Sequence, residues 1–383
     1  MAMSRPEEQC PIQCQLCEVD PMIKWKCLDC DLLMCSKCKD QIHSKFKSEK
    51  EHKIIDIKDV GRQDKTVDQK SKEMDQEDQK LVSISGLQTA GVSSALTNDK
   101  LIINVKEYQT EMLNIHFLAV TFDGSLWIGD GAKRDLHYIC TSLQNVQLLR
   151  DKVKVISRFN MVILRIAVTP TNDILMATGT PRLMQIKAGA NRVEESIYYE
   201  DMSRDIWSVH VSKDGRVIIG GGKFVVVMDT NGSYLTRYEN DKNKKTLFKG
   251  KLVCSITSTC NGNIFIVEYF NKGVIMLGKD DVINIYKGNP VYNYYTGSFN
   301  PISVVTTPMD NVLVADNGNH TLHILDNNCR LLTVCNIGDI GIKRPASLAI
   351  IMEEPFPVLY IGCDVYDSNS KKGKLYKMNI LEC

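Results

Sequence analysis

A hairpin-forming pattern recurs about every 45 residues along most of this chain, and it constrains the fold more than any other feature of the sequence. Each copy consists of an apolar segment, a short turn rich in Asp, Asn and Gly, and a second apolar segment. Asp-Gly and Asn-Gly pairs favour two-residue type I′ turns, in which both central residues have positive φ. Five clear copies and a sixth that is split in two cover residues 118–128, 166–177, 209–219, 256–266, 304–315, and 346–350 with 358–361.

Repeats of this length, each supplying several short strands, are typical of a β-propeller. Six units that close into a ring leave no open sheet edge, which removes the aggregation hazard of so many strands. We therefore predict an all-β, six-bladed propeller over residues 85–383. The apolar segment 100–106 precedes the first copy, and we expect it to pair with 374–380 as the outer strand of the last blade.

The repeat at 304–315 continues with the segment 314–326, in which Asp316, Asn319 and His320 form an Asp-x-x-Asn-His sequence. This segment resembles an NHL repeat, whose signature is such a turn between the second and third strands of a blade. The resemblance implies an NHL-like propeller. A catalytic Asp–His pair is one interpretation. We favour the other, in which Asp316 caps backbone amides of the turn and His320 packs over it.

The first 57 residues contain potential zinc ligands at a characteristic spacing. A Cys-x2-Cys pair aims two thiolates at one tetrahedral ion, so three such pairs and two histidines supply two closed sites. A module this small cannot bury enough apolar surface to fold alone. Structural zinc would supply roughly 10–16 kcal/mol per ion. The eight candidate ligands are Cys14, Cys17, Cys27, Cys30, Cys35, Cys38, His43 and His52.

The ligand order resembles that of a B-box zinc finger, and we assign residues 10–57 to such a module. In B-boxes the first and third ligand pairs share one ion, and the second and fourth pairs share the other. The resemblance implies one site formed by Cys14, Cys17, Cys35 and Cys38, and a second formed by Cys27, Cys30, His43 and His52. The spacing from His43 to His52 is longer than usual, so Asp40 or Asp31 is an alternative to His52.

Composition and charge give weaker indications. The opening MAMSRPEEQC has no apolar signal segment, so we expect a cytoplasmic, reducing location in which thiols bind zinc rather than form disulfides. No apolar run is long enough to span a bilayer, and we expect no membrane association. The net charge is −3 over residues 1–99 and +4 over 100–383, so neither part has the basic excess typical of nucleic-acid binding.

Residues 58–84 form a polar segment between the two expected domains. It has too few apolar residues for the seam of a coiled coil, so we interpret it as a solvated linker. The overall order resembles that of tripartite-motif proteins, in which a RING precedes the B-box and a coiled coil follows it. Because this coiled coil is missing, the resemblance does not imply an oligomer here.

Three functions fit this organisation. We favour a zinc-binding adaptor that binds protein partners through a propeller face and has no catalytic residue. The family resemblance makes a ubiquitin-ligase role the first alternative, although only thirteen residues precede Cys14, too few for a RING. RNA binding is the second alternative, with 242–251 as its basic segment and Phe248 as its aromatic residue. A catalytic channel is disfavoured, because only His210 of the propeller's histidines falls on an expected inner strand.

Overall fold

The computed structural model describes three short segments near the N-terminus and most of the chain from residue 102 to 380. The chain divides into two compact units, Met1–Gly91 and Val92–Cys383. The predicted linker 58–84 lies outside the described residues. The described residues are 24–27, 32–41, 53–56, 102–134, 137–150, 152–240, 244, 246–248, 253–268, 272–279, 281–292, 298–353, 356–364 and 372–380.

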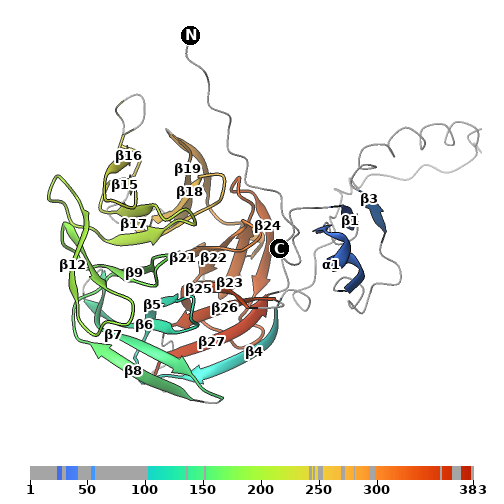
Figure 1. Ribbon diagram of the computed structural model, residues 1–383, viewed down its shortest axis with the longest axis horizontal. Helices are drawn as coiled ribbons and strands as arrows, with labels where there is room; N and C mark the ends of the chain where they lie inside the picture. The colour runs from blue at the N-terminus through green and yellow to red at the C-terminus, as the bar shows by residue number, and fades with distance from the viewer. Residues whose placement is uncertain are drawn as a thin grey trace, which may run out of the picture. The chain divides into compact units, whose positions relative to one another are not determined.

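Six antiparallel sheets of four strands make up the second unit, as predicted, and Figure 1 shows them following one another around a ring. The first strands of the six blades contact one another around this ring, so they are the inner strands. Blade 1 contains β5 (Ile115–Val120), β6 (Leu126–Arg134), β7 (His137–Leu148) and β8 (Val153–Phe159). Blade 2 contains β9 (Arg165–Val168), β10 (Ile174–Ala177), β11 (Arg182–Ile186) and β12 (Glu194–Tyr199). Blade 3 contains β13 (Ser208–Val211), β14 (Val217–Gly220), β15 (Val225–Met228) and β16 (Tyr234–Tyr238).

The remaining blades repeat this order, and a 3-10 helix, η6 (Pro290–Tyr292), lies in one connection between blades. Blade 4 contains β17 (Val253–Ser258), β18 (Ile264–Glu268), β19 (Gly273–Leu277) and β20 (Val282–Tyr286). Blade 5 contains β21 (Pro301–Thr306), β22 (Val312–Asp316), β23 (Thr321–Leu325) and β24 (Leu331–Asn336). Blade 6 contains β25 (Pro345–Glu353), β26 (Phe356–Cys363), β27 (Lys374–Ile380) and β4 (Ile102–Gln109).

The sixth blade closes the ring with an early strand of the chain. β4 pairs antiparallel with β27, from Lys374 opposite Gln109 to Ile380 opposite Ile102. Side-chain contacts reinforce the pairing, since Glu107 accepts hydrogen bonds from both Lys374 and the hydroxyl of Tyr376. This confirms the predicted closure, with a strand that extends three residues beyond the expected segment.

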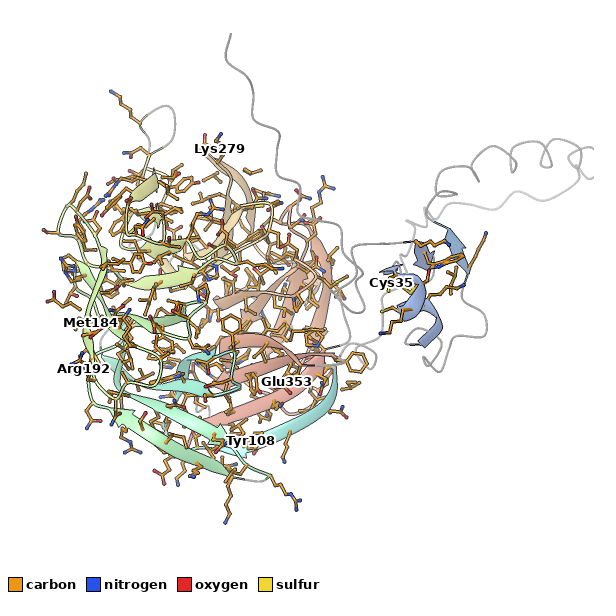
Figure 2. All side chains as sticks on the ribbon, viewed as in Figure 1. Cys35, Tyr108, Met184, Arg192, Lys279 and Glu353 are labelled. Atoms are coloured by element: carbon orange, nitrogen blue, oxygen red, sulfur yellow. The ribbon has the colours of Figure 1, made fainter. Side chains whose placement is uncertain are left out.

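Side chains crowd the interior of the ring (Figure 2), and the apolar ones form clusters between neighbouring blades. There are six such clusters among the described residues, one for each pair of adjacent blades. Burying one of these Leu, Ile or Val side chains contributes about 1.5–3 kcal/mol. Each cluster receives one equivalent inner-strand residue: Leu118, Ile166, Val209, Ile256, Val304 and Leu348.

The turns between the first and second strands differ from the predicted type I′ geometry. In the first blade, the Gly124 amide donates to the Thr121 carbonyl at 2.9 Å, and the Thr121 amide donates to the Ser125 carbonyl at 3.0 Å. Gly124 has a positive φ of 79°, and Asp123 is not among the residues with positive φ. The loop therefore has three residues and one left-handed position. The Thr121 hydroxyl donates to Asp123 at 2.5 Å, and Asp123 accepts the Ser125 amide, which stabilises this longer loop.

The described part of the first unit contains a small sheet in the order β2-β1-β3 and one helix. Its elements are β1 (Trp25–Cys27), β2 (Leu32–Met34), α1 (Ser36–Gln41) and β3 (Ile54–Asp56). The central strand pairs antiparallel with both neighbours. Among the described residues, no helix has the length and apolar character needed to cross a membrane.

Candidate functional site

The best-described part of the predicted zinc centre is the Cys35–Cys38 pair. Cys35 directly precedes α1 and Cys38 lies in the first turn of that helix, and both side chains are buried. The backbone amide of Cys38 donates a hydrogen bond to Cys35 Sγ at 3.4 Å, and that of Lys39 donates to the Cys35 carbonyl at 3.0 Å. An amide directed at sulfur stabilises a thiolate, the form in which cysteine binds metal. This local geometry suits a zinc knuckle.

The small sheet brings a second part of the predicted centre close to the end of the module. Cys27 ends β1, and its backbone lies opposite Ile54 of β3. Ile54 is only two residues beyond His52 in the sequence. Trp25 of β1 donates from its indole to the Ser36 hydroxyl at 3.3 Å, which connects the sheet to α1. The predicted sharing of one site by Cys27, Cys30, His43 and His52 stays a prediction, because Cys30, His43 and His52 lie outside the described residues.

The structure describes only some of the predicted ligands. For Cys27 it describes the backbone, and for Cys35 and Cys38 also the side chains. Of the alternatives to His52, the backbone of Asp40 lies in α1, whereas Asp31 is not described. Within the described part of the chain, no group of three or more His, Cys, Asp or Glu side chains is arranged to hold a metal. The ligands outside the described residues are Cys14, Cys17, Cys30, His43 and His52.

In the propeller, the Asp-x-x-Asn-His turn has a structural role. Asp316 is fully buried, and its Oδ1 accepts hydrogen bonds from the backbone amides of Asn300, Gly318 and Asn319 at 3.1–3.2 Å. Burial alone would raise the pKa of Asp316, but hydrogen bonds from His323 and Asn319 hold it below its usual value. The prediction that Asp316 caps the turn is confirmed.

The two histidines of this repeat also serve the fold. His320 adopts a positive φ of 58°, and its Nδ1 accepts the backbone amide of Arg344 at 3.1 Å, so it joins the turn to the start of β25. His323 is 1% exposed, and its Nδ1 lies 2.7 Å from the Tyr286 hydroxyl. Neither ring is directed at an open site, which agrees with the packing role predicted for His320.

The inner strands surround a central channel with a cavity of about 230 Å³. His210 lines it as predicted, and its Nε2 lies 2.9 Å from the Ser258 hydroxyl. His116 also lies on an inner strand and lines the channel, which corrects the expectation that His210 alone does so. The expected strand began at Leu118, whereas β5 begins at Ile115 with a bulge at His116.

Burial controls the ionisation of these channel groups. It lowers the pKa of His210 to about 4, and burial together with the nearby Arg165 charge lowers the pKa of His116 to about 3. His116 Nε2 lies 2.7 Å from Asp364 Oδ1, yet burial raises the pKa of Asp364 to about 6. For Asp364, the loss of solvation outweighs the opposing effects of the Arg344 charge and the hydrogen bond from Asn317. Both histidines are neutral at pH 7.

The loops that lead from each blade into the next inner strand present apolar side chains to solvent. Because all inner strands begin at one end of the ring, these loops share one face, which we call the loop face. In the described parts of five of its six loops, one large apolar residue is exposed; the loops 239–252 and 287–300 are only partly described. The five residues, which are 47–76% exposed, are Leu113, Val162, Met202, Val291 and Ile340.

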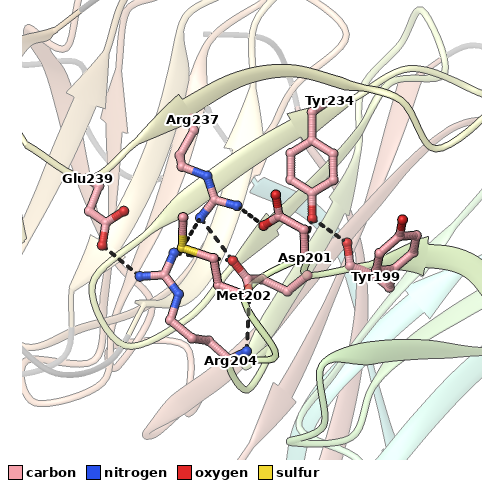
Figure 3. Close-up of polar contacts among 8 residues, drawn as sticks. Tyr199, Asp201, Met202, Arg204, Tyr234, Arg237 and Glu239 are labelled. Atoms are coloured by element: carbon pink, nitrogen blue, oxygen red, sulfur yellow. Dashed lines mark hydrogen bonds and ion pairs between the residues drawn. The ribbon is translucent and has the colours of Figure 1, made fainter.

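One of these loops is held by the charged network in Figure 3. Glu200 has a fully buried side chain that accepts from Arg204 at 3.2 Å and from Arg237 at 2.9 Å. Arg204 also contacts Glu239 at 2.6 Å, and Arg237 pairs with Asp201. Burial would raise the pKa of Glu200, but hydrogen bonds from the Arg204 amide and both guanidinium groups lower it. The network fixes the loop that carries Met202.

Comparison with known proteins identifies the first unit. Residues 14–54 match the ANCHR-like B-box zinc-binding domain, and this segment includes all eight predicted ligands. The N-terminal unit contains a B-box zinc-binding domain. No curated protein matches the sequence significantly. The chain thus combines a B-box with an all-β, six-bladed propeller.

Solved structures resemble the propeller only distantly. A catalytically inactive virginiamycin B lyase from Staphylococcus aureus, crystallised with quinupristin, is 10% identical, with a TM-score of 0.47 over 73% of this chain and 99% of that one. A streptogramin B lyase is 10% identical, with a TM-score of 0.46 over 73% and 98%. A protein of unknown function from Bacteroides caccae is 14% identical, with a TM-score of 0.46 over 62% and 82%.

Proposed function

We propose that this chain is a cytoplasmic protein-interaction adaptor that binds partner proteins through the loop face of its propeller, while its B-box holds two zinc ions. The main support for this proposal is that five loops of the loop face each expose a large apolar residue. Exposed apolar groups gathered on one face are typical of protein interaction sites. Aromatic and methionine side chains are favoured at such interfaces, and Met202 is 59% exposed.

The rigidity of the loop face supports the same function. A surface that is ordered before binding loses less conformational entropy when it captures a partner. The Glu200 network orders the Met202 loop, and the Tyr234 hydroxyl adds to it by donating to the Tyr199 carbonyl and accepting the Asp201 amide, both at 2.7 Å. The Met202 loop is thus suited to bind a partner without large rearrangement.

The alternatives have less support. RNA binding would use an exposed aromatic residue beside the basic segment 242–251, but Phe248 is fully buried and its ring is not available for stacking on a base. We assign no catalytic residue, since Asp316, His320 and His323 have roles in the fold. The ubiquitin-ligase alternative stays a prediction, which a reconstituted assay with a panel of conjugating enzymes tests.

Partner capture by matched variants tests the adaptor proposal. Replacing Met202, Val291 and Ile340 with serine should abolish the capture of partners by the full-length chain, detected by proximity labelling and pull-down. The control replaces Phe122, which is 70% exposed in a turn at the opposite end of the ring, and it should retain the same partners. Equal capture by both variants would refute the assignment of the loop face.

A further inference from the structure

A ring of six equivalent residues lines the channel just inside its loop-face end. Each of the six directly precedes, in the sequence, the equivalent inner-strand residue named above for its blade. Each also lies opposite a residue of the second strand of the same blade. Four of the six are serines, one is aromatic and one is charged. The ring consists of Phe117, Arg165, Ser208, Ser255, Ser303 and Ser347, all of which line the cavity.

Arg165 brings a positive charge into this ring without a matching negative one. Its Nη1 donates to the Leu164 carbonyl at 2.8 Å, and it also contacts the Cys254 thiol. No carboxylate in the described part of the chain forms an ion pair with it. Burial raises the pKa of Cys254 to about 11, so the thiol is neutral and supplies no countercharge. Arg165 is only partly exposed to solvent, so its charge is incompletely solvated, and an anion bound in the channel would offset part of this cost.

The serines beside Arg165 offer hydroxyl donors for such an anion. Ser208 is 0% exposed, and its Oγ has no hydrogen-bond partner in the described part of the chain. The Ser255 hydroxyl oxygen accepts the Val304 amide, and the Ser303 hydroxyl oxygen accepts the Leu348 amide, both at 3.2 Å. Because the oxygens of Ser255 and Ser303 act as acceptors, their hydroxyl protons remain for donation.

The charge and shape of the cavity select the class of anion. Among the described residues that line it, Arg165 has the only formal charge at neutral pH, since the two histidines are neutral. One positive charge balances one carboxylate but not a dianion. Phe117 and Val209 also line the cavity, with side chains that pack mainly in the inter-blade clusters. A cavity of about 230 Å³ would hold roughly seven water molecules, which is the size of a small organic acid.

We propose that the loop-face end of the channel is a binding site for a small monocarboxylate, whose carboxylate pairs with Arg165 and accepts hydrogen bonds from Ser208 and its neighbouring serines. The site is separate from the exposed apolar residues of the loop face, so it does not depend on the adaptor function. A charge-assisted pair in a partly desolvated channel is stronger than a neutral hydrogen bond.

Titration of the full-length chain with sodium acetate and sodium butyrate tests this site by isothermal calorimetry and thermal unfolding at constant ionic strength. Wild type should show saturable binding and a saturable rise in Tm. Arg165→Gln should weaken binding about tenfold or more, and Ser208→Ala several-fold. The control Arg158→Gln removes a half-exposed arginine from β8 and should bind as wild type does.

Three results would overturn the proposal. They are an absence of saturable binding by wild type, an Arg165→Gln variant that binds as well as wild type, and an equal response to sodium sulfate or chloride, which would indicate a general salt effect. If Arg165→Gln does not fold, Ser208→Ala decides the matter, since unchanged affinity in that variant would equally exclude the site.

Discussion

Glu200 should be a main anchor of the loop face, and replacing it with alanine should destabilise the propeller measurably. Its carboxylate is fully buried and accepts the Arg204 amide at 2.9 Å as well as both guanidinium groups. Removing one partner of a buried pair costs about 3–5 kcal/mol. Arg204 and Arg237 are 30% and 21% exposed, so water would solvate them in part, and we expect a loss of about 2–3 kcal/mol.

Thermal unfolding followed by circular dichroism measures this loss. A change of this size should lower the Tm by roughly 3–5 °C in a unit of this length. The matched control is Glu195→Ala on β12, since Glu195 is 74% exposed and lies 3.5 Å from Arg182. An exposed pair of this kind contributes less than about 1 kcal/mol. Equal Tm values for the two variants would refute the view that the network anchors the loop.

The same network predicts a dependence on pH. The pKa of Glu200 is lower in the folded chain than its ordinary value of 4.5. A carboxyl group with a lowered folded pKa stabilises the protein fully above its unfolded pKa, and this contribution is lost as the pH falls through the folded value. The difference in stability between wild type and Glu200→Gln should therefore be constant from pH 6 to 8 and shrink below about pH 4.5. A difference that grows on acidification would contradict the assignment.

Three further outcomes follow from the fold. Native mass spectrometry of the full-length chain should show two zinc ions, and Cys35→Ser should lose at least one, whereas Cys260→Ser, which changes an exposed cysteine in the propeller, should keep both. Deleting β4 should expose the edge of β27 and cause aggregation on size-exclusion chromatography; a stable monomer would contradict ring closure. Asp316→Ala should lower stability by about 2–4 kcal/mol in urea denaturation, because one buried and two partly buried amides lose their acceptor; a change below about 0.5 kcal/mol would argue against the cap.

The propeller could be predicted because its repeat is local and regular. Each hairpin combines apolar segments with turn residues within a few positions, so the number of blades and the closing strand followed from the pattern. The predicted type I′ geometry is wrong for a physical reason. The prediction considers only the pair Asp123-Gly124. The hydroxyl of Thr121, two residues before Asp123, donates a hydrogen bond to Asp123 and favours a three-residue loop. A Thr or Ser two positions before an Asp or Asn is the sequence signal that indicates this three-residue loop.

The channel could not be predicted in the same way. His116 occupies a bulge, and bulges shift a strand without a clear mark in the sequence. The role proposed for Arg165 depends on the serines at the equivalent position of other blades. These positions can be matched only by aligning all six repeats. The zinc ligands are the opposite case, because their spacing alone defines the chemistry, and the B-box match covers that same segment.

The pairing of β4 with β27 has a consequence for how the protein is made. Glu107 and its partner Lys374 are 267 residues apart, so a ribosome adding 5–20 residues per second would complete the second strand roughly 13–55 s after the first. During that interval, β4 of the nascent chain has no partner in its own blade. Its exposed Val105 and unpaired backbone would be open to chaperones and to other chains. Slow steps in translation between β4 and β27 should therefore reduce the yield of folded protein more than equal delays before residue 102.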